Sequence, residues 1–195
     1  MRKRSLPTNN RHVRNQRLPE RKFTRAGILW TILSTILYIV CFPLNPLILT
    51  GIVETSSHPV LFALGWVFWT IGMVFVMAPI VMFPRWGGVP KGKSFVHTTQ
   101  LVDSGLYSLV RHPQYLGGIL AIFITTMLFY PHWLFVILGV LGTTTLYMSC
   151  KEEEAYLIKQ FGDEYRRYIK KVTRMNILVG FVRMLRRMVA RRRNS

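Results

Sequence analysis

Two groups of polar residues flank an apolar hairpin in the second half of the chain. The first group, Arg111, His112 and Pro113, directly precedes the apolar residues 115–130. The second group, the run Glu152–Glu154, follows a further apolar segment at 133–150. Charged side chains held at membrane boundaries by adjoining apolar helices are candidates for a functional site. We therefore expect these two groups to contribute to one site.

The first group has the chemistry of an anion-binding site. Proline suits the first turn of a helix, so Pro113 predicts that a helix begins there. The start of a helix presents free N–H groups and the positive end of the helix dipole, which attract a carboxylate or another anion. Arg111 adds a fixed positive charge and His112 adds a second donor.

The second group has the chemistry to hold a cation or sugar hydroxyls. Successive residues of a helix point about 100° apart, so at most two of the three glutamates can face a helix bundle. We expect Glu152 to lie at a solvated junction. The inward carboxylates could hold an ammonium, a sulfonium or the hydroxyls of a ribose. Together with the anion-binding group, they suit a zwitterionic ligand.

Charge and apolar residues are segregated along the chain. The chain has 195 residues, is 50% hydrophobic and carries a net charge of +18. Residues 1–25 contain nine Lys/Arg, residues 151–195 contain thirteen, and the 125 residues between contain four. Basic ends around an apolar middle predict a multi-pass membrane protein with both termini and the site in the cytosol. A prokaryotic plasma membrane and the endoplasmic reticulum both fit this charge pattern.

Clustered Lys and Arg are also a footprint of nucleic-acid binding. The aromatic residues lie inside the apolar runs, so they do not support that interpretation. We favour topogenic charge and attraction to anionic membrane lipids, and we expect no nucleic-acid partner.

The hydropathy pattern predicts an all-α membrane helix bundle with about four transmembrane helices. The apolar runs cover residues 26–49, 59–83, 115–130 and 133–150. The third run is short for a bilayer span of about 20 residues, so it is tilted or extended at its start. The remaining periodicity predicts cytosolic amphipathic helices at 152–172 and 176–190. Cys41 and Cys150 fall towards opposite faces of the membrane, so we expect no disulfide, and their spacing predicts no metal site.

The motifs around the hairpin resemble those of a known family. An Arg-His-Pro-x-Tyr-x-Gly element at 111–117 is followed by Glu-Glu-Glu-Ala-Tyr at 152–156 and Phe-Gly-Asp-Glu-Tyr at 161–165. This order resembles the integral-membrane methyltransferases, which include the isoprenylcysteine carboxyl methyltransferases and the phospholipid N-methyltransferases. The likeness covers residues 99–174.

The resemblance implies S-adenosylmethionine as the cofactor and a lipophilic small molecule or lipid as the methyl acceptor, which would arrive from the bilayer. With the charge and hydropathy pattern, we expect a basic tail (1–25), a transmembrane hairpin (26–83), a methyltransferase-like catalytic core (84–175) and a basic amphipathic tail (176–195). The resemblance implies catalytic roles for Arg111, Glu153 and Glu154. The cofactor-binding positions that it implies are Gln100, Leu101, Val102, Tyr107, His112, Pro113, Gln114 and Tyr115.

The chain departs from the family pattern at two places. The isoprenylcysteine enzymes carry an arginine just before the glutamates, whereas this chain reads Tyr147-Met-Ser-Cys150. Their Val-Pro-Arg ending reads Val172-Thr-Arg174 here. Both changes weaken a prenylcysteine assignment more than a methyltransferase assignment, so a carboxylate, an amine and a thiol all stay open as acceptors.

Other interpretations stay open at this point. Tyr165 and Tyr168 are equally compatible with ligand contact and with anchoring at the membrane interface, and His97 has no assigned role. The basic ends also fit a non-enzymatic membrane protein that organises anionic lipids or a partner. A reductase related to the membrane sterol reductases is a further alternative.

Overall fold

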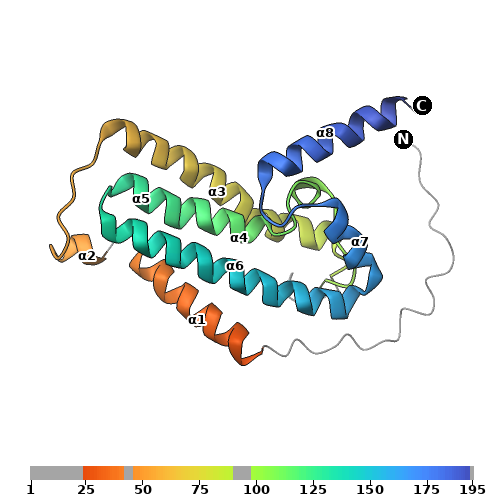
Figure 1. Cartoon of the computed structure of the whole chain (residues 1–195), viewed down its shortest axis with the longest axis horizontal. Helices are drawn as coiled ribbons and strands as arrows, with labels where there is room; N and C mark the ends of the chain where they lie inside the picture. Colours follow the sequence, from red (N-terminus) through yellow and green to blue (C-terminus); the bar gives the residue numbers. More distant parts are fainter. Residues whose placement is uncertain (1–23, 42–45, 90–97, 194–195) are drawn as a thin grey trace.

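The computed structural model describes residues 24–41, 46–89 and 98–193, which form an all-helical bundle (Figure 1). A 3-10 turn, η2, lies in the segment between α3 and α4, and a π-helical turn, η3, joins α4 to α5. In chain order the elements are α1 (Arg25–Val40), α2 (Pro46–Leu49), α3 (Pro59–Trp86), η2 (Gly105–Ser108), α4 (Pro113–Gly118), η3 (Ile119–Ile124), α5 (Thr125–Phe129), α6 (Trp133–Phe161), α7 (Asp163–Lys171) and α8 (Ile177–Arg193).

The centre of the bundle is the continuous rod α4–η3–α5, which lies along α3 on one side and α6 on the other, while α1 packs on α6 (Figure 1). A close crossing joins the rod to α3. A Cβ added to Gly72 would come within 2.5 Å of the Ala121 nitrogen, and one added to Gly117 would come within 2.6 Å of the Gly72 oxygen. The glycines therefore let the two helix backbones touch, as small residues do in membrane helix pairs.

Local signals set where the helices begin. Pro59 and Pro113 occupy the first turns of α3 and α4, where a missing N–H costs nothing. The Thr24 hydroxyl accepts a hydrogen bond from the Gly27 nitrogen (2.9 Å) and caps α1. The His132 ring accepts one from the Leu134 nitrogen (3.2 Å) and caps α6. The predicted start of the third apolar helix at Pro113 is confirmed.

Within the described ranges, two helices are long and apolar enough to cross a membrane: α3 with 28 residues and α6 with 29. The other two apolar segments are shorter, α1 with 16 residues and the rod at Pro113–Phe129. At 1.5 Å per residue, α1 would reach about 24 Å against a hydrocarbon core of about 30 Å. A count of four transmembrane helices therefore stays a prediction.

Helix α6 continues without a break past the apolar residues 133–150 and through the three glutamates to Phe161. The sequence predicted a separate amphipathic helix at 152–172, and the structure instead places the break at Gly162, whose φ of +57° favours glycine. Helix α7 then carries Asp163 and Glu164 in its first turn and Lys170 and Lys171 in its last. These charges match the helix dipole.

Candidate active site at the motif-bearing end of the hairpin

Glu154 is the centre of a buried charged cluster. Its side chain is 9% exposed, and three cationic or polar side chains converge on its carboxylate. Arg111 Nη2 lies 3.0 Å from Oε1, and His112 Nε2 lies 3.2 Å from the same oxygen. Arg174 donates from Nε to Oε1 (3.0 Å) and from Nη2 to Oε2 (2.7 Å). The two polar groups recognised in the sequence thus meet, and a third segment joins them.

A short parallel pairing of backbone segments holds the cationic residues in place. Val110 and Thr173 form a parallel β-bridge. The Arg111 nitrogen donates to the Thr173 oxygen (2.8 Å), and the His112 nitrogen donates to the Arg174 oxygen (3.2 Å). The residues that precede α4 are thereby fixed to those that follow α7, so the position of Arg174 depends on the same backbone contacts as that of Arg111.

Two buried tyrosines of α7 make polar contacts with residues of the predicted site. The Tyr165 hydroxyl lies 3.4 Å from His112 Nε2, and the Tyr168 hydroxyl donates to the Tyr107 carbonyl (2.6 Å). Burial raises the pKa of Tyr165 above its usual value, and the charge of Glu154 adds to that rise. Both phenols therefore stay protonated at neutral pH, and Tyr168 serves as a hydrogen-bond donor.

Electrostatics keep the Glu154 carboxylate ionised. Burial alone would raise its pKa, but hydrogen bonds from His112 and Arg174 and the charge of Arg111 outweigh that effect and lower the pKa to about 2. The same contact raises the pKa of Arg174 above its ordinary value. A carboxylate in this state binds positive charge and is a weak base.

Arg111 has unused hydrogen-bonding capacity. The residue is only 8% exposed, and one of its terminal nitrogens meets Glu154. Its Nε and Nη1 atoms are buried and have no hydrogen-bond partner among the described residues. An unpartnered buried donor costs free energy, so a guanidinium in this state is suited to an acceptor that arrives from outside the chain.

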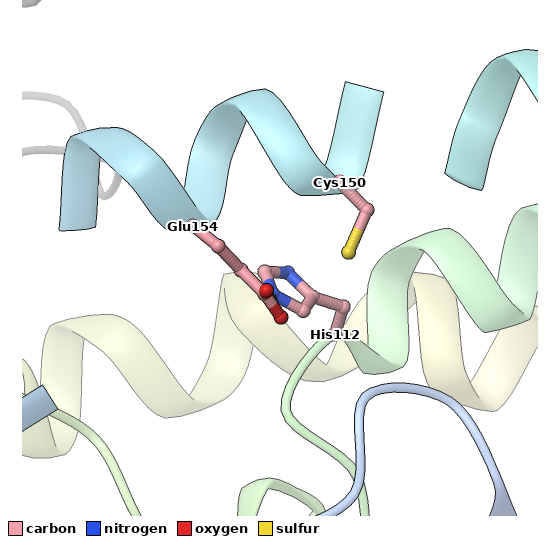
Figure 2. A group of neighbouring side chains, drawn as sticks. All are labelled: His112, Cys150 and Glu154. Atoms are coloured by element: carbon pink, nitrogen blue, oxygen red, sulfur yellow. Dashed lines mark ion pairs between the residues drawn. The ribbon is translucent and has the colours of Figure 1, made fainter. Parts of the chain in front are cut away.

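Figure 2 shows His112 reaching up from the loop before α4 towards Cys150 and Glu154 on α6. The possible ligand atoms of these three residues lie within 4.8 Å of one another, a grouping that the sequence spacing did not predict. Because Arg111 and Arg174 already meet both oxygens of Glu154, their charges would repel a metal cation. We keep the prediction that no metal is used.

The predicted residues fall into separate environments. Within the glutamate run, Glu154 is buried, whereas Glu153 is half-buried. Glu152, expected in solvent, is also half-buried, and it accepts a hydrogen bond from the Thr24 hydroxyl (2.9 Å). Arg111 and His112 of the first polar group both contact Glu154 of the second. The sequence predicted that these two groups meet.

The predicted cofactor positions are more widely spread. Val102 and Tyr107 are buried in one apolar cluster, and Leu101 packs on the cluster of Tyr165 and Tyr168. The Tyr115 ring meets the His112 ring edge-on at 5.7 Å. Pro113 is buried, whereas Gln100 and Gln114 are exposed.

Sequence reasoning missed Arg174 as a partner of Glu154. The side chain also donates to the Tyr147 hydroxyl (2.6 Å) and lies over its ring. The signal was present as the arginine of Val172-Thr-Arg174, but only the fold brings it to α6. His97 lies outside the described residues.

Comparisons with known proteins identify the family. The family model described as phospholipid methyltransferase matches residues 60–164, more than half of the chain. Methanethiol S-methyltransferase of Pseudomonas deceptionensis is 30% identical to this chain over 119 residues. The aligned part is 57% of this chain and 42% of that protein. Protein-S-isoprenylcysteine O-methyltransferase of Schizosaccharomyces pombe is 34% identical over 92 residues. That aligned part is 43% of this chain and 39% of that protein.

A third relative, methanethiol S-methyltransferase 1 of Bradyrhizobium diazoefficiens, is 40% identical over 68 residues, 35% of this chain and 23% of that protein. The chain thus spans less than half the length of each of these relatives. No solved structure gives a significant match. Because the family match covers α3, the rod α4–η3–α5 and α6 with its glutamates, the chain belongs to the phospholipid methyltransferase family.

Proposed function

We propose that the protein is an integral-membrane methyltransferase that uses S-adenosylmethionine and methylates a lipophilic or membrane-embedded acceptor. The buried cluster of Arg111, His112, Glu154 and Arg174 carries the proposal. It lies at the cytosolic end of the hairpin in the topology that the basic termini predict. Two apolar helices of spanning length, α3 and α6, support the membrane placement.

The site fits the charges of this cofactor. The two unpartnered donors of Arg111 suit its carboxylate. Glu154 is already held by Arg111, His112 and Arg174, so the carboxylate of the neighbouring Glu153 is the one that suits the cofactor's positive groups or ribose hydroxyls. When bound, S-adenosylmethionine would supply a methyl group on a sulfonium sulfur; an acceptor atom would bond to the methyl carbon in line as the carbon–sulfur bond breaks, leaving a neutral thioether. The contribution of this chain is to orient the reactants and to exclude water.

The state of Glu154 favours an acceptor that is already anionic. A carboxyl group with a pKa of about 2 removes a proton from an ammonium poorly, because an efficient general base has a pKa near the working pH. Nearby guanidinium groups stabilise a thiolate or a carboxylate. We therefore rank a thiol or carboxylate acceptor above a lipid amine; two of the relatives are named as methanethiol S-methyltransferases.

The rivals make different predictions. A non-enzymatic lipid-organising protein would need no ligand for the two unpartnered buried donors of Arg111. A reductase would bind a nicotinamide cofactor. Incubation of the purified protein in nanodiscs with methyl-labelled S-adenosylmethionine and three acceptors separates them. A hydrophobic thiol or a prenylcysteine should become labelled faster than phosphatidylethanolamine. Absence of label in all three, with a folded protein, would contradict the proposal.

A further inference from the structure

The last helix presents an apolar face that the bundle does not cover. Helix α8 extends away from the other helices in Figure 1. At 100° per residue, five exposed apolar residues fall within an arc of about 100°. Leu178 and Val189, at 79% and 66% exposure, are the most open of them. The full set is Leu178, Phe181, Val182, Leu185 and Val189.

Two arginines of α8 lie outside the apolar arc. Arg183 lies about opposite the centre of the apolar arc, and Arg186 flanks it. Residues 165–195 contain eleven Lys/Arg and no Asp or Glu. An apolar arc with arginines on the opposite and flanking sides is typical of a helix that lies in the interface of an anionic membrane.

The base of α8 sets where it leaves the bundle. Ile177 packs on a cluster that includes Phe75 of α3 and Leu116 of α4. Gly180 lies so close to the Leu109 carbonyl that a Cβ there would collide with it. Its first turn thus contacts residues of two apolar helices, so α8 begins against the apolar part of the bundle.

We propose that α8 is a docking surface for the anionic cytosolic leaflet of the membrane, with its apolar arc in the acyl boundary and its arginines at the headgroups. The proposal rests on the membrane placement proposed above and is independent of methyl transfer. A second copy of the chain is a poorer partner for this surface, because residues 165–195 of both copies carry only positive charge.

Spin labels on opposite sides of α8 test this directly. Leu185→Cys places a nitroxide on the apolar arc, and Arg183→Cys places one opposite as the matched control. Each full-length protein is reconstituted into nanodiscs of phosphatidylcholine alone or mixed with phosphatidylglycerol. The accessibility of the label to oxygen and to a nickel chelate is then measured. The native residues Cys41 and Cys150 are buried. Labelling of the unsubstituted protein measures how much spin label they take up.

In anionic nanodiscs we expect the label at position 185 to favour oxygen over the nickel chelate several-fold, and the label at position 183 to show the reverse. The contrast should shrink in pure phosphatidylcholine. Equal access of the chelate to both labels would overturn the proposal, and so would shielding of position 185 from both reagents, which indicates a protein partner. Equal contrast in both lipids would overturn the anionic preference. Because no cofactor is used, these results do not depend on methyl transfer.

Discussion

Arg174 and Glu154, which lie twenty residues apart in the chain, form a two-point contact with distances of 3.0 and 2.7 Å. The contact joins the segment after α7 to the buried end of α6. Bidentate pairs of arginine and carboxylate fix geometry as well as charge. Arg174 therefore acts as a positioning residue that orients Glu154 towards Arg111 and His112.

Substitution of this arginine should destabilise the fold. We expect Arg174→Gln to lower the free energy of unfolding by about 2 kcal/mol, because it removes charged hydrogen bonds from a buried carboxylate. The matched control is Arg166→Gln, which affects an exposed pair with Asp163 at 3.9 Å and should change stability by less than about 1 kcal/mol. Thermal unfolding in detergent measures both, and equal effects would contradict the positioning role.

The Glu154 carboxylate should make stability fall in acid. Its pKa in the folded protein is about 2, against 4.5 for the free group. A lowered pKa contributes stability that is present above 4.5 and is lost as the pH falls towards 2. Melting temperatures between pH 7 and pH 3 should therefore decline more steeply in the native chain than in Glu154→Gln. Parallel curves would show that Glu154 is not held in its charged form by the cluster.

The two site tyrosines should differ in their contribution to stability. Tyr168→Phe leaves the buried Tyr107 carbonyl without its 2.6 Å donor, which should cost about 1–3 kcal/mol. Tyr165→Phe removes a longer contact of 3.4 Å to His112 and should cost about 1 kcal/mol or less. Chemical denaturation of both variants measures the order, and the reverse order would be inconsistent with these contacts.

The glycine crossing between α3 and the rod should not tolerate a side chain. We expect Gly72→Leu to destabilise the bundle by at least about 1–3 kcal/mol, because a Cβ at this position already overlaps the backbone at Ala121. Ala63→Leu adds similar bulk to an exposed position of the same helix and is the control. Comparable melting temperatures for the two variants would mean that α3 and the rod do not cross at Gly72.

The sequence predicted the contact between the two halves of the motif but not its third partner. Pro113 is a local signal, and it correctly placed the start of α4. The helical period showed that at most two of the three glutamates can face the bundle. It did not show that Glu154 is the buried one, because that depends on how α6 packs. Arg174 was beyond prediction because a backbone pairing between residues 110 and 173 brings it to Glu154, and pairing across such a separation has no local signature.

Binding of S-adenosylhomocysteine, the demethylated product of the proposed cofactor, tests the central claim most directly. At a hundred times its dissociation constant, the ligand should add about 2.7 kcal/mol to the stability of the native protein. It should add much less to Arg111→Gln, whose two unpartnered donors are lost, and the full amount to the exposed control Arg85→Gln. Equal stabilisation of all three proteins would place the cofactor elsewhere. No stabilisation of the folded native protein at millimolar ligand would contradict the proposed function.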